Sequence, residues 1–452
     1  MHYIYQQVLE RLLSHMSQAQ RASLQLLIQR LLVAAGGPEY IGTFRLLVLH
    51  GNDRRSTRLL AMLRAAQLSI ALRAPVTFQL RVLVVSLPSA DRATLEGHER
   101  CFSALFMQDD QRVQLEMIEG REVVPFSCQP VVVRERWQQA RDAMLVFGHL
   151  VDARPEALLG SRLHLELAEA VGLALRDQAA DVLVTAVPAR LRRKYLAWAR
   201  RSLRRAGAHG SQQVHQCLAM LAQGLGWVQG TLDGALDTQG EAAASVATEE
   251  APVRVFAIDD LLPHLLGVQQ LDVMLGCCFE GARDAWPLAA FSEPSALLQL
   301  HELYDHSLEP LAGRPALRLA GKPGGSRHGD VQPVQFGKAY GINQTQLVCV
   351  LFRPFARQGR NLERFLQCRH ADMLVALPYL HRALQGKSCP EAVKDWLVNT
   401  SGLPLGQLRA IYGGRLRLTT WRLMNHLAQR DIHLRWMPPC APGQRRDAAG
   451  QP

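Results

Sequence analysis

Two short apolar runs on either side of a helical segment constrain the fold of this chain most strongly. The runs are "TFRLLVLHG" (43–51) and "TFQLRVLVVSLP" (77–88), and the segment between them is "DRRSTRLLAMLRAAQ" (53–67). Each run is long enough for a buried strand, and the apolar residues of the segment recur at helical spacing. A strand, a helix and a second strand of these lengths predict a βαβ unit, and therefore a parallel sheet.

Further elements extend this unit into a domain of mixed α/β type. Residues 1–35 show the periodicity of one or two amphipathic helices, and "DVLVTAVP" (181–188) predicts a third strand. The segment "LDTQGEAAASVATEEAPV" (236–253) is small, polar and acidic, which is typical of a linker. We therefore expect a degenerate, nucleotide-fold-like α/β domain in residues 1–235, the linker at 236–253, and a second domain in residues 254–452.

The second half of the chain predicts a C-terminal α/β regulatory domain with a helical end. A strand-like run and a helix follow the linker in "VRVFAIDDLLPHLLGV" (253–268), and residues 293–311 show the periodicity of another helix. Strands are expected at "TQLVCVLFRPF" (345–355) and "ADMLVALPYL" (371–380), with the helix "GRNLERFLQCR" (359–369) between them.

No stretch of the sequence indicates export or insertion into a membrane. There is no apolar run of about 18 residues or more, which a transmembrane helix needs. The N-terminus, "MHYIYQQVLERLLSHMSQAQ", lacks the basic start, apolar core and cleavage site of a secretory signal. The nine cysteines form no CxxC pair, which predicts reduced thiols rather than disulfides or a metal site. These features predict a cytoplasmic protein without a transmembrane segment.

No motif of an enzyme is present. The turn "HGNDRRST" (50–57) joins the first strand to its helix, but it matches neither GxxxxGK[ST] nor GxGxxG. The chain also lacks G-x-S-x-G and HExxH, and its 16 histidines show no pairing with an acidic ligand at metal-binding spacing. We therefore expect no catalytic residues, no metal or other cofactor, and no enzyme activity.

The chain is basic, and arginine carries the charge. The net charge is +11, with 46 arginines and only 5 lysines. Arginine makes bidentate contacts to phosphates and guanine edges, which favours a nucleotide or nucleic-acid partner, although coding bias in a GC-rich genome produces the same composition. Residues 190–205 include eight basic residues and no acid. They form either a solvated helix packed on a sheet or a helix that faces nucleic acid, anionic lipid or an acidic partner.

A glycine-rich turn in "GKPGGSRHGDVQPVQFG" (321–337) carries Arg327 and Asp330, which project to the same side of a tight turn. The arginine can donate to a phosphate or to guanine O6 and N7, and the aspartate can accept from guanine N1–H and N2–H. Arg369 and Asp372 are a second candidate ligand-binding pair, for which a salt bridge is the simpler explanation. Composition alone gives about two Arg-x-x-Asp matches, so the prediction depends on the position of the first pair before a predicted strand.

The residues around this turn resemble the GIL (GGDEF I-site-like) domain of BcsE-type regulators of cellulose biosynthesis. "RHGD" (327–330) matches the R-x-G-D motif of that family, and "TQLVCVLFRPFARQGRNLERFL" (345–366) is similar to the strand and helix behind it. "VPARLRRKYLAWARRSLRR" (187–205) is similar to another of its helices. The resemblance implies that Arg327 and Asp330 bind cyclic di-GMP. It also implies a non-catalytic bacterial regulatory protein that contacts other proteins of a secretion or surface-polymer complex.

The sequence departs from that family in two ways. No GGDEF active-site motif is present, so the resemblance does not imply a cyclase. The chain is also shorter than three-domain members of the family, and the resemblance therefore implies that one of their domains would be missing or reduced.

Residues 394–436 support a different hypothesis. A helix, the turn "SGLPLGQ", the helix "LGQLRAIYG" and a third helix "TTWRLMNHLAQR" fit a helix-turn-helix layout and resemble compact repressor-type domains. In that arrangement Gln407, Arg409 and Arg415 would contact DNA, and the protein would be a transcriptional regulator. The same helices could instead cap the C-terminal sheet. A third hypothesis is an interaction subunit of a secretion or surface-polymer machine that binds no ligand.

Overall fold

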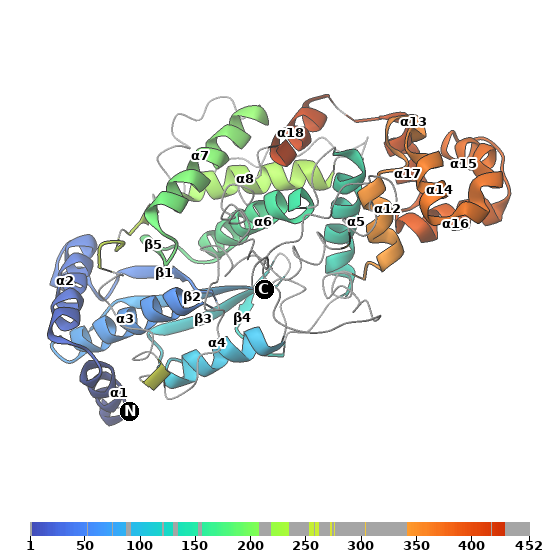
Figure 1. Cartoon of the computed structure of the whole chain (residues 1–452). Coiled ribbons are helices and arrows are strands. Elements are labelled where there is room, and N and C mark those ends of the chain that lie inside the picture. The colour runs from blue at the N-terminus through green and yellow to red at the C-terminus, as the bar shows by residue number, and fades with distance from the viewer. Residues whose placement is uncertain are drawn as a thin grey trace, which may run out of the picture. The chain divides into compact units, whose positions relative to one another are not determined.

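Two compact units, each made of several chain segments, make up the protein (Figure 1). The first contains Met1–Arg136, Leu163–Gly230 and Ala243–Glu293, and the second contains Trp137–Arg162, Thr231–Ala242 and Pro294–Pro452. The computed structural model describes residues 2–51, 53–74, 76–86, 92–119, 122–129, 134–151, 156–207, 218–234, 253–256, 258–261, 272–273, 275, 303, 341–416 and 418–429.

A six-stranded sheet forms the centre of the described part of the first unit. Its strands, in spatial order, are β4 (Glu122–Pro125), β3 (Val113–Glu119), β2 (Gln79–Ser86), β1 (Arg45–Leu49), β5 (Val182–Thr185) and β6 (Arg254–Val255). Neighbouring strands are parallel, except that β4 is antiparallel to β3. The predicted βαβ unit is confirmed, because α3 (Arg54–Ala71) connects β1 to its parallel neighbour β2. The predicted mixed α/β fold class is confirmed as well.

Helices cover both faces of this sheet. Side chains alternate along a strand, so that Leu46 of β1 and Val82 of β2 lie in one hydrophobic core together with the apolar residues of α3. Arg81 points to the opposite face, where it donates to the carbonyl oxygen of Ala174 at the end of α6 (Glu156–Asp177). Strands buried on both faces are continuous apolar runs, and this is the pattern from which β1 and β2 are predicted.

The helices predicted in residues 1–35 and 190–205 are present in the first unit. α1 and α2 pack against α3 and confirm the amphipathic helices predicted in residues 1–35. The described helices of this unit not yet given are α1 (His2–Ser14), α2 (Gln18–Ala35), η1 (Pro38–Tyr40), α4 (Arg92–Ala104), α7 (Ala189–Arg205) and α8 (Leu218–Asp233).

The strand-like run that follows the predicted linker belongs to the first sheet and does not open the C-terminal domain. Its residues Arg254–Val255 form β6, which pairs in parallel with β5. Ile258 and Leu261 are buried in the core beneath the same sheet. The linker lies outside the described residues except for Val253, and so does all but residue 303 of the helix predicted at 293–311.

The second unit is helical throughout the part that the structure describes (Figure 1). The predicted helix at 359–369 is confirmed by α14. Within the described residues, no helix is both long and apolar enough to span a bilayer. The helices are α5 (Arg134–Leu150), most of which belongs to this unit, α12 (Gln344–Phe352), α13 (Ala356–Gly359), α14 (Leu362–Arg369), η4 (Ala371–Ala376), α15 (Leu377–Leu384), α16 (Glu391–Ser401), α17 (Leu405–Gly413) and α18 (Leu418–Gln429).

The strands predicted at 345–355 and 371–380 are wrong, because both segments are helical. Asn343 and Gln346 form a capping box that starts α12: each side chain accepts a hydrogen bond from the backbone N–H of the other. Every residue from 346 to 352 is buried, so the run has no polar face by which a helix could be distinguished from a buried strand. In the second segment, Pro378 lies in the first turn of α15, where a missing N–H is tolerated.

Candidate functional site

The carboxyl edge of the parallel sheet is the place where a fold of this type binds its ligands. The strand order puts the topological switch point between β1 and β5, where the connections diverge to opposite sides. β1 leads into α3 and β5 leads into α7, so the N-termini of both helices lie at this point. A helix N-terminus presents unpaired N–H groups and a partial positive charge to an anion such as phosphate.

Carboxylates of the chain itself occupy both of these N-termini. At α3, Asp53 accepts hydrogen bonds from two backbone N–H groups of the first turn, at 2.8 and 3.0 Å, and from the Ser56 hydroxyl at 2.6 Å. At α7, Asp259 accepts from the backbone N–H of Ala189 at 3.0 Å and pairs with Arg192. The hydrogen bond from Arg192 lowers the pKa of Asp259, which keeps this carboxylate charged. An internal anion therefore fills each position that a phosphate would take.

Two buried histidines meet at the end of β1. The Nδ1 atoms of His50, which follows β1, and His98, on α4, are 2.8 Å apart, so that one ring donates to the other. Burial holds the pKa of His50 well below its usual range and lowers the pKa of His98 to about 4. The rings pack against Phe102 and Phe126. Because both rings are buried and both pKa values are lowered, we assign this pair as a neutral hydrogen bond between the residue after β1 and α4. No metal-binding group of three or more ligands occurs among the described residues.

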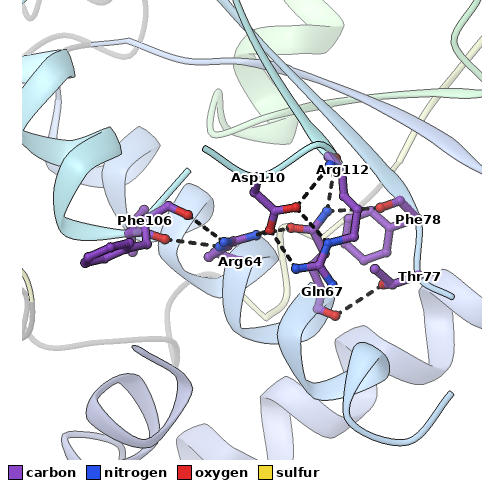
Figure 2. A network of polar contacts seen from close by, with 8 residues as sticks. Arg64, Gln67, Thr77, Phe78, Phe106, Asp110 and Arg112 are labelled. Atoms are coloured by element: carbon purple, nitrogen blue, oxygen red, sulfur yellow. Dashed lines mark hydrogen bonds and ion pairs between the residues drawn. The ribbon is translucent and has the colours of Figure 1, made fainter. Parts of the chain in front are cut away.

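A larger polar network lies inside the first unit (Figure 2). The fully buried Arg64 of α3 donates to Asp110 at 2.8 Å and to Gln67 at 2.7 Å. Burial opposes the charge on Asp110, but hydrogen bonds from Arg112 and Arg64 outweigh it and lower the pKa of Asp110 to about 2. Arg64 also donates to two carbonyl oxygens of the loop between α4 and β3. The network therefore fixes α3 to this loop, and its role is structural.

The structure describes the second of the two R-x-x-D pairs, Arg369 and Asp372, but not the first. Arg327 and Asp330 lie outside the described residues, as does the glycine-rich segment around them. Arg369 is the last residue of α14, and Asp372 lies in the first turn of η4. Both of these side chains are exposed.

Aromatic packing holds the corner that carries Arg369 and Asp372. His370 lies between them, and its ring centroid is 5.2 Å from that of Phe365 and 5.2 Å from that of Trp396, perpendicular to the latter. Phe365 is fully buried. The backbone at this corner is therefore anchored in the core of the second unit, while the charged side chains on either side are accessible to a ligand.

The three helices predicted for the helix-turn-helix are confirmed as α16, α17 and α18. Gly402 ends α16 in the left-handed conformation that favours glycine. Of the residues predicted to contact DNA, Gln407 and Arg409 are half-buried and Arg415 is exposed. Arg409 Nε donates to the carbonyl oxygen of Ala383 in α15 at 3.0 Å. Arg409 thus joins two helices of the unit, and Arg415 is the residue of the three that faces solvent most.

Sequence reasoning missed the charged residues at the helix N-termini. Asp53 precedes Ser56 by three residues at the start of a helical pattern, and this spacing could have identified it as an N-cap. Asp259 and Arg192 are 67 residues apart, so no local pattern connects them.

Comparison with protein-family models, with curated proteins and with solved structures gave no significant match. The resemblance to GIL domains therefore stays a prediction from the residues that carry it.

Proposed function

We propose that this protein is a bacterial regulatory protein that binds cyclic di-GMP, or a similar guanine nucleotide, and acts through contacts with other proteins of a secretion or surface-polymer complex. The observation that carries the proposal is the sequence Arg327-His-Gly-Asp330 within a glycine-rich segment that is predicted to form a turn. Its arginine supplies paired donors for phosphate or for the O6 and N7 atoms of guanine, and its aspartate accepts from guanine N1–H and N2–H. The glycines allow the backbone to approach the ligand closely.

A second pair with the same chemistry supports the proposal. Arg369-His-Ala-Asp372 repeats the arginine, histidine and aspartate of the first motif at the same spacing. Its two charged side chains are exposed on an anchored corner. Each half of cyclic di-GMP carries one guanine and one phosphate, so the ligand offers the same pattern of donors and acceptors twice. We therefore include Arg369 and Asp372 as a second candidate contact.

The occupied N-termini of α3 and α7 support a regulatory role for the first unit rather than nucleotide hydrolysis. A triphosphate at the switch point would meet the carboxylates of Asp53 and Asp259 in place of free N–H donors. Like charges about 4 Å apart repel by several kcal/mol at a partly buried site. The fold thus keeps the architecture of a nucleotide-binding sheet while its usual phosphate positions are filled.

Isothermal titration calorimetry of the full chain with cyclic di-GMP tests the nucleotide proposal. We expect Arg327→Ala and Asp330→Ala each to weaken the affinity about tenfold or more, because a charge-assisted hydrogen bond contributes about 1.5–3 kcal/mol. Arg327→Lys keeps the charge but loses the planar fork, and should also bind more weakly. Arg364→Ala, at an exposed position of α14, is the matched control and should bind as the wild type does. The proposal fails if the wild type does not bind, or if the Arg327→Ala, Asp330→Ala double variant binds normally.

The alternative is a transcriptional regulator that binds DNA through its C-terminal helices. The confirmed order of α16, α17 and α18 and the exposure of Arg415 favour it. The contact of Arg409 with α15 argues against a DNA contact by that residue. An Arg415→Gln variant, measured for binding to duplex DNA by fluorescence anisotropy, tests this alternative directly.

A further inference from the structure

One face of α7 is basic along the whole helix. Exposed residues recur at helical spacing, at positions 190, 193, 197, 200 and 204, and all of them except Ala197 are arginines. Lys194 and Arg201 are half-buried beside this row, and Arg205 is exposed at its end. We define the α7 basic face by the cationic residues Arg190, Arg193, Lys194, Arg200, Arg201, Arg204 and Arg205.

The opposite face of α7 is fixed within the first unit. Trp198 and Leu203 are buried. The Tyr195 hydroxyl donates to the carbonyl oxygen of His164 in α6 at 3.1 Å. Leu203 packs so closely on Gly224 of α8 that a Cβ atom at that glycine would lie 2.8 Å from it. Because its apolar residues are used inside the protein, α7 cannot insert into a bilayer in the way that a free amphipathic helix does.

The positive charges at the start of α7 destabilise the helix. A cation near a helix N-terminus is unfavourable by about 0.3–1 kcal/mol. Arg190 nevertheless lies in the first turn of α7, and Arg193 is the first residue after that turn. The first turn contains no acidic residue. Arg192 differs, because it points to Asp259 and forms an ion pair of 2.5 Å.

Several arginines of the α7 basic face have no acidic partner in the described part of the chain. Arg190, Arg193, Arg204 and Arg205 form no ion pair with any described carboxylate, whereas the adjacent Arg192 does. Arg204 and Arg205 lie in the last turn, where positive charge is favourable, but Arg190 and Arg193 oppose the start of the helix. Charges that weaken the helix and that no described carboxylate neutralises indicate a partner outside the fold, since local rules are broken chiefly at functional sites.

From these observations we propose that the α7 basic face docks on the sugar–phosphate backbone of double-stranded DNA, independently of base sequence and of the nucleotide site. Its charges form two groups, at 190–194 and 200–205. With a rise of about 1.5 Å per residue, the centres of the groups lie roughly 15 Å apart. The major groove of B-DNA is about 12 Å wide and has a phosphate backbone on each side. Each group can contact one strand, with the small Ala197 over the groove.

The same features distinguish a duplex from other anionic partners. Single strands are bound largely by stacking of bases on aromatic rings. The aromatic residues of α7, Tyr195 and Trp198, instead pack against His164 and against each other. An amphipathic helix that binds a lipid surface buries its apolar residues in the bilayer, but those of α7, such as Trp198 and Leu203, are buried inside the protein. Arginine also forms bidentate contacts with phosphate, which suits a rigid row of backbone phosphates.

Fluorescence anisotropy of the full chain with labelled duplexes of about 20 base pairs tests this proposal at about 50 mM salt. The test variant combines Arg190→Gln, Arg193→Gln, Arg204→Gln and Arg205→Gln, at exposed positions where glutamine is a good helix former. We expect at least about tenfold weaker binding. A plot of log affinity against log salt should also be shallower by about 0.9 for each phosphate that the variant no longer neutralises. Two duplexes of unrelated sequence should bind the wild type equally.

A charge-matched control separates a local contact from the effect of net charge. Arg73→Gln, Arg100→Gln, Arg360→Gln and Arg364→Gln remove the same number of charges from exposed positions on other elements and should leave binding almost unchanged. The proposal is overturned if the wild type does not bind the duplex, if this control weakens binding as much as the α7 variant, or if Arg415→Gln alone abolishes it. It is also overturned if the α7 substitutions abolish co-sedimentation with phosphatidylglycerol vesicles but leave duplex binding intact.

Discussion

At the scale of single residues, buried arginines and buried histidines are stabilised in opposite ways. Arg64 and Arg81 are buried as cations, and each is paired with a buried carboxylate, Asp110 and Glu116 respectively. The histidines are held neutral, because burial makes the charged imidazole unfavourable. The buried histidines therefore couple stability to mildly acidic pH.

His149 gives the clearest test of this coupling. Its ring is fully buried against Phe355, neither ring nitrogen has a hydrogen-bond partner in the described part of the chain, and burial lowers its pKa to about 3. In the unfolded chain the pKa is about 6.5, so the unfolded state binds the proton first and stability falls as pH falls below that value. Between about pH 7.5 and about pH 5 this histidine should account for a loss of about 2 kcal/mol.

His149→Leu should remove that loss. We expect the free energy of unfolding of the variant, from urea titrations, to decrease about 2 kcal/mol less than that of the wild type between about pH 7.5 and about pH 5. The value at the higher pH is the control for packing, because the imidazole is neutral there in both states. Identical pH dependence in the two proteins would mean that His149 is protonated in the fold.

At the scale of secondary-structure elements, the sequence predicts correctly the short apolar strands whose ends are marked by polar or turn residues. β1, β2 and β5 fit this description and are predicted correctly. β3 is missed because Glu116 interrupts its apolar run, and the reason for that glutamate is its pairing with Arg81 on the neighbouring strand. The strand-like run predicted after the linker contains β6, but only two of its residues form the strand. Asp53 could be found as a cap, but the acidic partners of Arg64 and Arg192 could not, since tertiary contacts alone bring these pairs together.

The helix α12 shows how a cap decides between a strand and a helix in an apolar run. Asn343 Oδ1 accepts from the backbone N–H of Gln346 at 2.9 Å, and Gln346 Oε1 accepts from that of Asn343 at 3.1 Å. Asn343→Ala should lower the free energy of unfolding by about 1 kcal/mol, because it leaves a donor at the helix start unpaired. Asn343→Ser keeps a hydrogen-bond acceptor at this position and should lower the free energy of unfolding by only a few tenths of a kcal/mol. Equal losses for the two variants in urea denaturation would argue against the cap.

At the scale of the whole molecule, the chain leaves the first unit and returns to it. The second unit takes its residues from three separate stretches, and a segment beyond residue 250 supplies β6 and part of the core of the first unit. This returning segment also supplies two consecutive carboxylates. Asp259 reaches Arg192 and the start of α7, and Asp260 pairs with Arg30 of α2. The first unit is therefore completed only when the chain beyond the predicted linker has docked.

The two neighbouring aspartates allow this docking to be measured with an internal control. Asp259 is 28% exposed and accepts three hydrogen bonds, whereas Asp260 is 62% exposed and makes an ion pair with the half-exposed Arg30. Asp259→Asn should therefore lower the free energy of unfolding of the first unit by about 1–2 kcal/mol. Asp260→Asn should lower it by about 0.5 kcal/mol or less.

Hydrogen exchange of amides in β5 and α7, compared between the two variants, shows whether the loss is local. Only Asp259→Asn should speed exchange there, because it alone frees the first turn of α7 and leaves Arg192 unpaired. If both variants exchange at the wild-type rate, the returning segment is not held through Asp259, and β6 and the buried Ile258 and Leu261 must hold it instead.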